Sequence, residues 1–227
     1  DHMADLGFLP VVTRILAATP PKGQRLLFSA TLSNGVDKLV KRFLTDQVTP
    51  SVDEVTSHVE AMTHSVFEVD GVEAKKNLVQ QLASGTGRSI LFMRTKHTAK
   101  KLAKSLTEQG IPAVDLHGNL SQGARERNLA AFGADTDAGG VRVHVATDVA
   151  ARGVHVDGVE LVVHVDPPVE HKAYLHRSGR TARAGAEGTV VTVTLEAQRR
   201  DVGDLLRKAQ IRAALEPVSA GHPEVAA

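Results

Sequence analysis

The stretch from Ser89 to Leu106, SILFMRTKHTAKKLAKSL, joins the two patterns that decide the fold. Its first five residues form a short apolar run, which is typical of a buried strand. The residues that follow place apolar side chains on one side of a helix, namely Ala99, Leu102, Ala103 and Leu106. This strand-then-helix unit recurs along the chain. Strands separated by helices predict an α/β fold with a mainly parallel sheet covered by helices on both faces.

The same reasoning predicts the remaining elements. Strands are expected at residues 24–29, 62–69, 113–116, 141–146, 161–165 and 189–195. Helices are expected behind the capping residue Ser33, in a segment ending near Ala83, at 121–132, near Tyr174 and in a segment ending near Ala209. Gly85 and Gly87 follow a helix and precede a strand, so they indicate a helix end and not a phosphate loop.

Periodicity divides the chain into four parts. Residues 1–46 supply one clear strand and its neighbouring helices, too little to bury both faces of a sheet. Residues 47–60 lose all periodicity and are predicted to be a linker. Residues 61–212 carry the full alternation and are predicted to fold around their own core. Residues 213–227 have little charge and are expected to form a flexible tail.

Composition and charge limit the function classes. The 227 residues hold 27 basic and 26 acidic side chains, so the net charge of +1 provides no general attraction for nucleic acid. Aromatic residues make up only 3%, which disfavours base-stacking platforms. The chain has no cysteine, which excludes disulfides and thiolate zinc sites and suits a reducing cytoplasm. Its apolar runs are strand-sized, so no membrane association and a cytoplasmic location are expected.

The histidines do not predict a metal site. His171 and His176 are five residues apart, which is not the same-face spacing of a helix. Ordinary polar or capping roles are expected for His117, His144 and His164.

The most specific polar segment runs from Tyr174 to Gly185, YLHRSGRTARAG. It carries four basic side chains, namely His176, Arg177, Arg180 and Arg183, and no acid occurs between His171 and Ala186. This concentration of positive charge favours a phosphate site. The alternative is a solvated basic helix.

Two further polar segments follow apolar strands. Residues 145–153, VATDVAARG, place a hydroxyl and backbone amides where they can meet phosphates at a strand's carboxyl end. Residues 28–31, FSAT, also follow an apolar strand, but so short a segment is weaker evidence for a phosphate contact. Simple helix capping by Thr or Asp is the alternative for both segments.

Taken in order, five segments resemble the motifs of the DEAD-box RNA helicases. The amino acids in these motifs resemble those of the bacterial, actinobacterial-like branch of that family. The five segments are Ser29 to Thr31, Leu91 to Thr95, Leu116 to Gly118 with Gln122 and Arg125, Thr147 to Gly153, and His176 to Arg183. The resemblance covers residues 1–210. It implies that residues 61–212 are the second RecA-like domain and residues 1–46 the end of a first one. Asp1 would close the Asp-Glu-Ala-Asp box, although residues 1–3 also match a cloning scar.

In that family ATP and RNA bind between the two RecA-like domains. The resemblance implies catalytic roles for the arginine fingers Arg180 and Arg183 and for His176, which would couple them to the first domain. It implies ATP contacts by Gly153, His155, Asp157, Arg180 and Arg183. It implies RNA-backbone contacts by Arg94, Thr95, Gly118, Gln122, Arg125 and Thr147. It also implies that coupling between the domains depends on Ser29, Thr31, Asp148, Arg152 and Arg177.

Two departures from the family pattern matter. The chain has no Gly-x-x-x-x-Gly-Lys-Ser/Thr segment, so ATP and Mg²⁺ are expected to be held mainly by the missing first domain, and this chain alone is expected to be inactive. His155 stands where the family usually has an aspartate that accepts a hydrogen bond from the ribose. Asp157 lies on the same side of an extended run and is the candidate replacement.

The expected partners are RNA, bound with low sequence specificity because phosphates are read, and the missing N-terminal domain. The strand in residues 1–46 is expected to dock on the second domain, to pair with another copy of the chain, or to stay mobile. The leading hypothesis is an RNA-stimulated ATPase that separates short duplexes or remodels RNA–protein complexes. The alternatives are a related DNA translocase and a non-enzymatic RNA-binding or partner-binding module.

Overall fold

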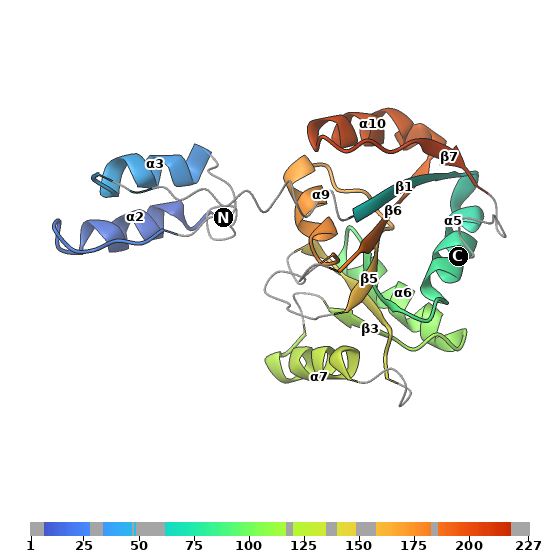
Figure 1. Ribbon diagram of the computed structural model, residues 1–227. Helices are drawn as coiled ribbons and strands as arrows, with labels where there is room; N and C mark the ends of the chain where they lie inside the picture. The colour runs from blue at the N-terminus through green and yellow to red at the C-terminus, as the bar shows by residue number, and fades with distance from the viewer. Residues whose placement is uncertain are drawn as a thin grey trace. The chain divides into compact units, whose positions relative to one another are not determined.

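A computed structural model describes residues 7–27, 34–46, 48, 62–116, 120–134, 140–148, 158–182 and 186–218. The chain divides into two compact units, residues 1–52 and 53–227, drawn with their element labels in Figure 1. In the described parts of both units, no helix has the length and apolar character required to cross a bilayer.

The smaller unit contains two helices, α2 (Leu9–Ala17) and α3 (Asn34–Phe43). The helix expected behind residue 33 is confirmed as α3, whose Val36 and Leu39 are buried. Arg25 joins the two helices, because it donates to the carbonyl of Phe43 at 2.9 Å and to Oγ1 of Thr19 at 2.9 Å.

The strand expected at residues 24–29 is wrong where the structure describes it. Residues 24–27 belong to no strand, and Leu26 is 72% exposed. A lone apolar run forms a strand only when a neighbouring strand satisfies its backbone groups. No neighbouring strand occurs among residues 7–27 and 34–46.

The larger unit is built on one sheet of seven parallel strands in the order β3-β4-β2-β5-β6-β1-β7 (Figure 1). The strands are β1 (Met62–Val69), β2 (Arg88–Phe92), β3 (Ala113–Leu116), β4 (Val143–Ala146), β5 (Val159–His164), β6 (Gly188–Leu195) and β7 (Leu215–Pro217). The sequence-based fold class, an α/β protein with a mainly parallel sheet, is therefore confirmed.

Helices cover both faces of this sheet. The helices are α5 (Gly71–Ala83), α6 (Lys96–Glu108), α7 (Gln122–Gly133), α9 (His171–Ser178) and α10 (Arg199–Lys208), with a 3₁₀ turn at Glu196–Gln198. Leu91 of β2 packs in one cluster with residues of α5 and α6, whereas Ile90 and Phe92 pack in a second cluster with α7, α9 and α10. This alternation follows from the period of two along a strand.

The predicted strands at 62–69 and 113–116 are confirmed residue for residue, and the other four predicted in this unit shift by up to two residues at their ends. The expected flexible tail needs correction at its start. Leu215–Pro217 extends the sheet beside β1, and Val218 is buried in the core. Pairing with Val66, Phe67 and Glu68 satisfies this segment's backbone, which no local pattern could indicate.

All strands are parallel, so their carboxyl ends lie along one edge of the sheet. The central strands β4, β2 and β5 are neighbours there. Consequently Thr147 and Asp148 after β4, Arg94 and Thr95 after β2, and Asp166 after β5 come close together, although they are far apart in the sequence. This is the edge at which parallel α/β folds bind their ligands.

Candidate functional site

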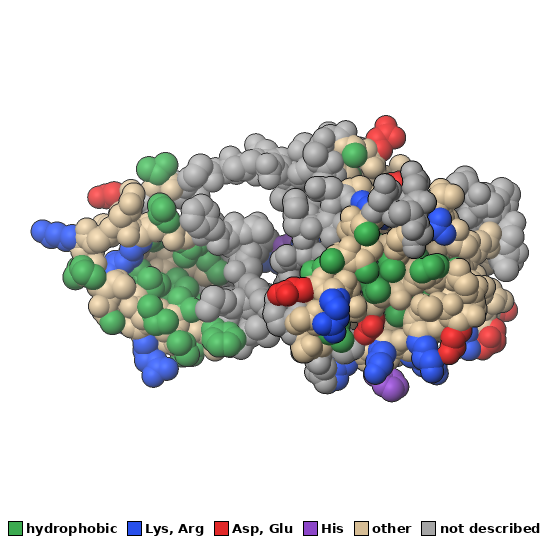
Figure 2. Space-filling model, turned by 90° about the horizontal axis from the view of Figure 1, so that it is seen from below, with side chains coloured by type: hydrophobic (Ala, Val, Ile, Leu, Met, Phe, Trp, Pro, Cys, Tyr) green, Lys and Arg blue, Asp and Glu red, His purple; other side chains and the backbone are tan. Residues whose placement is uncertain are grey.

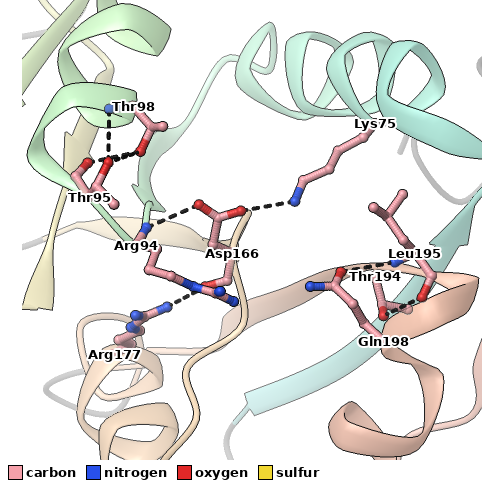
Figure 3. Close-up of polar contacts among 9 residues, drawn as sticks. All are labelled: Lys75, Arg94, Thr95, Thr98, Asp166, Arg177, Thr194, Leu195 and Gln198. Atoms are coloured by element: carbon pink, nitrogen blue, oxygen red, sulfur yellow. Dashed lines mark hydrogen bonds and ion pairs between the residues drawn. The ribbon is translucent and has the colours of Figure 1, made fainter.

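Asp166 lies at the centre of this edge and holds two elements together (Figure 3). Its Oδ1 accepts from Nζ of Lys75 on α5 at 3.0 Å, and its Oδ2 accepts from the backbone amide of Arg94 at 3.0 Å. The side chain of Lys75 is only 16% exposed and that of Asp166 only 23%. The carboxylate thus balances a largely buried ammonium and fixes the start of the loop between β2 and α6.

Arg177 on α9 connects the ends of β4 and β5. Its Nε and Nη2 donate to the two carboxylate oxygens of Asp148 at 2.5 and 2.8 Å. Its Nη1 donates to the carbonyl of Asp166 at 2.7 Å, as Figure 3 shows. The guanidinium also lies 5.1 Å from the ring centre of Phe92. Arg177 is therefore a buried structural cation whose charge is already balanced, and it is not available to a phosphate.

Thr95 begins helix α6. Its Oγ1 accepts from the backbone amide of Thr98 at 3.2 Å, and the two hydroxyls lie 2.8 Å apart. An N-cap threonine satisfies one of the free amides of the first turn. Arg94 and Thr95 are both exposed, so their side chains border solvent beside the Asp166 carboxylate. Thr95, an expected RNA contact, is thus also the N-cap of α6.

Helix α9 carries His176 and precedes Arg180. Both side chains are half-buried, and Nε of Arg180 donates to the carbonyl of His176 at 3.3 Å. Tyr174 and Ser178 face the core from the same helix. The expected coupling residue His176 and the expected arginine finger Arg180 therefore lie on, and directly after, a helix that packs against the core.

Helix α9 packs against the core through stacked rings, namely those of His64, Tyr174 and His164. The rings of His164 and Tyr174 lie 4.3 Å apart, and Nδ1 of His64 lies 3.0 Å from the Tyr174 hydroxyl. Nε2 of His164 lies 3.3 Å from Oγ of Ser178. Burial lowers the pKa of His164 well below its ordinary value, and the charge of Arg177 lowers it further. Burial also lowers the pKa of His64 to about 4. These rings are neutral packing groups at pH 7.

Two other expected RNA contacts lie near β4. Thr147 is 8% exposed, and Arg125 on α7 is half-buried. The charge of Arg125 contributes to lowering the pKa of His144, after burial itself, so the two side chains lie near each other. Gln122 is the first residue of α7, three positions before Arg125.

The structure thus brings Arg94, Thr95, Thr147, Asp148 and Arg177 to one edge, next to the helix with His176. Eight expected site residues lie outside the described residues: Ser29, Thr31, Gly118, Arg152, Gly153, His155, Asp157 and Arg183. Asp166 and Lys75 were missed from the sequence. The position of Asp166 directly after an apolar strand was the available signal, whereas nothing distinguished Lys75 from its neighbour Lys76.

Comparisons with known proteins identify the class to which this fold and edge belong. Residues 73–185 match the family described as the helicase conserved C-terminal domain. The ATP-dependent RNA helicase RhlB of Pseudomonas syringae pv. tomato is 38% identical over 200 residues, which are 85% of this chain and 48% of that protein.

Two solved structures agree. The Escherichia coli DEAD-box protein SrmB, bound to the regulator RraA, is 33% identical with a TM-score of 0.62, over 68% of this chain and 91% of that chain. Saccharomyces cerevisiae Dbp5, bound to RNA and ADP BeF3, is 26% identical with a TM-score of 0.75, over 91% of this chain and 54% of that chain. The chain belongs to the DEAD-box helicase family and contains its C-terminal RecA-like domain. It spans about half the length of the RhlB relative.

Proposed function

We propose that this chain is the second-domain portion of an ATP-dependent RNA helicase. In this role it binds RNA backbone through Arg94, Thr95, Gly118, Gln122, Arg125 and Thr147, and it supplies Arg180 and Arg183 to the terminal phosphates of ATP. The parent enzyme couples hydrolysis to separating short duplexes or to remodelling RNA–protein complexes. The names of the relatives and the RNA and nucleotide bound to Dbp5 support the proposal.

The proposal rests mainly on one observation, which is that the basic side chains at this edge of the sheet differ in their surroundings. Arg177 and Lys75 are balanced by Asp148 and Asp166, respectively, and they set the architecture. Arg94 is exposed and Arg180 is half-buried. An edge that only needed to be stable would not require a further concentration of positive charge in a strand-end loop and a short helix.

The nucleotide fits this edge better than its metal ion does. A triphosphate is an anion that arginine forks bind well, which suits Arg180 and Arg183. Mg²⁺ requires carboxylate or phosphate oxygens, but both oxygens of Asp148 and both of Asp166 already accept from protein groups. The charges of these two acids are balanced by Arg177 and Lys75, and the described residues contain no group of three or more acids or histidines that could hold a metal ion. We assign the metal to the phosphates and to the family's first domain.

The test uses a longer protein that carries this chain behind the family's first RecA-like domain. ATPase stimulation is measured with single-stranded RNA and with DNA of the same sequence, in the parent and in Arg180→Ala, with Arg200→Ala on the exposed side of α10 as the matched control. RNA should stimulate and DNA should not, and Arg180→Ala should lower the rate about 10³-fold while RNA affinity changes little. Equal stimulation by DNA would favour a DNA translocase, and a normal rate in Arg180→Ala would reject the finger.

A further inference from the structure

Helix α6 carries an exposed basic face that the proposed site does not use. Its residues Lys96, His97, Lys100, Lys101 and Lys104 are all exposed. The only acid of the helix is Glu108 at its last position, 3.6 Å from Lys104, with both side chains more than 60% exposed. Since the whole chain has a net charge of only +1, this helix is a local concentration of positive charge.

The basic side chains all point away from the core. At about 100° per residue, the five positions fall within roughly 140° of the helix circumference. The buried side of the helix, formed by Ala99, Ala103 and Leu106, lies outside this arc. Lys96, Lys100 and Lys104 form a row in which successive residues are about 6 Å apart along the axis. A polyanionic strand running along the helix would therefore meet one ammonium group per turn.

The row begins where the proposed RNA site ends. Thr95 is the N-cap of α6, and the Arg94 amide is fixed by Asp166, so the direction of the helix is tied to the strand-end loop. Figure 2 shows Lys and Arg side chains with a histidine grouped at the lower margin of the larger unit, where acidic side chains also lie. A backbone bound at Arg94 and Thr95 has the exposed lysines of α6 to follow.

Helix α10 shows what an ordinary charged helix of this fold looks like. It packs on the opposite face of the sheet and mixes arginines with Asp201 and Asp204. Arg207 pairs with Asp204 at 2.9 Å, and Arg199 pairs with Glu68. Among the residues that the structure describes, Lys96, Lys100 and Lys101 form no such pair. A face whose only role was to stay solvated would more often alternate the two signs.

We propose that the exposed face of α6, formed by Lys96, His97, Lys100, Lys101 and Lys104, is a second RNA-backbone surface that continues the track starting at Arg94 and Thr95. The inference rests on the proposed function of that track. The basic positions from Lys96 to Lys104 span about 12 Å along the helix axis. At about 3.4 Å per phosphate along a strand, this face accommodates roughly four additional phosphates. Its contacts are purely ionic, so they lengthen the binding site without adding sequence preference.

The experiment measures RNA binding by the chain itself, using fluorescence anisotropy and two end-labelled single-stranded RNAs of mixed sequence. The short RNA has about six nucleotides and the long RNA about four more, which is the additional length that the basic face of α6 should cover. The test variant is K100Q/K101Q/K104Q, and the charge-matched control on α10 is R200Q/R207Q/K208Q. Each triple removes three positive charges and one exposed ion pair, and circular dichroism verifies folding.

We expect the α6 triple to bind the long RNA about tenfold more weakly and to bind the short RNA nearly as well as the parent does. Its plot of log K against log salt should be shallower by about 2, since each ammonium–phosphate contact contributes about 0.7 for single strands. The control should match the parent with both RNAs.

Three results would overturn the proposal. If the α6 triple binds like the parent while Arg94→Ala binds more weakly, the second surface does not exist and the proposed site stands. If both triples lose affinity equally, overall charge and not this face is responsible. Failure of the parent to bind either RNA would reject the RNA-binding role of the chain together with this inference.

Discussion

Arg177 and Asp148 form a two-point ion pair, in which Nε and Nη2 of the arginine donate to the two carboxylate oxygens at 2.5 and 2.8 Å. The arginine side chain is 4% exposed and the aspartate side chain 39%. The pair therefore joins a helix in the core to a loop that borders solvent. Because Arg177 follows His176 directly, the pair also sets the register between α9 and the residues after β4.

Asp148→Ala should destabilise the larger unit by about 2 kcal/mol. The substitution leaves a buried guanidinium whose remaining hydrogen-bond acceptor among the described residues is the Asp166 carbonyl. Breaking a buried pair typically costs about 3 to 5 kcal/mol, and the exposure of Asp148 reduces that cost. Urea unfolding followed by circular dichroism measures the change.

The matched control for this pair is Asp204→Ala, which breaks the exposed pair with Arg207. Both of its side chains are more than 60% exposed, so the loss should stay below about 0.5 kcal/mol. Equal losses in the two variants would mean that burial does not distinguish the two ion pairs.

Asp166→Asn should loosen the loop between β2 and α6 and lower stability by about 1 to 2 kcal/mol, because the largely buried Lys75 loses its counter-charge. Adding Lys75→Met should recover most of the stability, because the ammonium is then absent. It should not recover the hydrogen bond to the Arg94 amide. Amide hydrogen exchange at Arg94 should thus remain faster in both variants than in the parent.

The two variants also separate charge from geometry. If Lys75→Met does not improve on Asp166→Asn, the loss comes from the loop and not from the unpaired ammonium. If the Arg94 amide exchanges at the parental rate in Asp166→Asn, the amide side chain has replaced the carboxylate as acceptor, and the positioning role of the charge is wrong.

Sequence patterns predicted the central sheet well because its strands carry their own signal. The predicted strands at 62–69 and 113–116 match the structure residue for residue. Leu215–Pro217 has no such pattern, and it is a strand only because β1 offers an open edge. Conversely, the apolar run that includes Leu26 has the local pattern but no partner strand in the described part of its unit. In both cases the presence of a partner strand decides whether the segment becomes a strand. The local sequence does not indicate whether such a partner is present.

The sequence motifs selected residues that lie at this edge, but they did not indicate which side chains form ion pairs with each other. Motif order selected Asp148 and Arg177, which the structure joins across 29 positions of sequence. Nothing in the sequence indicated that Asp166 and Lys75, 91 positions apart, would form the second pair. The edge needs such pairs because Arg177 and Lys75 are largely buried, and a buried charge must be balanced inside the fold. The roles of the expected site residues stay predictions.

The folded chain should lose stability as the pH falls below 6.5. Burial, together with the charge of Arg125, lowers the pKa of His144 from its ordinary 6.5 to about 4. Between these values the unfolded chain binds a proton at this residue and the folded chain does not, so protons favour unfolding. His144 alone should account for a loss of about 2 kcal/mol between pH 6.5 and pH 5.

His144→Leu should remove this part of the pH dependence. Neither ring nitrogen of His144 has a hydrogen-bond partner among the described residues, so an apolar side chain of similar size should leave stability at pH 7.5 unchanged or higher. Urea unfolding at pH 7.5 and pH 5 gives the two differences. Parallel losses in parent and variant would show that another group causes the pH dependence.

The chain by itself should not hydrolyse ATP above background, with or without RNA. Its 227 residues contain no Gly-x-x-x-x-Gly-Lys-Ser/Thr segment. Such a loop and its lysine cradle the phosphates and bring Mg²⁺ to them, and arginine fingers only add stabilisation to a phosphate that is already positioned. The carboxylates of Asp148 and Asp166 do not replace that grip, because Arg177 and Lys75 already balance their charge.

Phosphate release from the purified chain, measured over a range of ATP concentrations, tests this expectation, and the same assay after addition of the family's first domain provides the positive control. Activity should appear only in the joined protein and should fall about 10³-fold in its Arg180→Ala variant. RNA-stimulated turnover by the chain alone, abolished by the same substitution, would mean that the catalytic machinery lies at the edge next to α9. In that case the Arg177 and Lys75 ion pairs would have to open during the reaction, and Asp148→Ala would raise the rate.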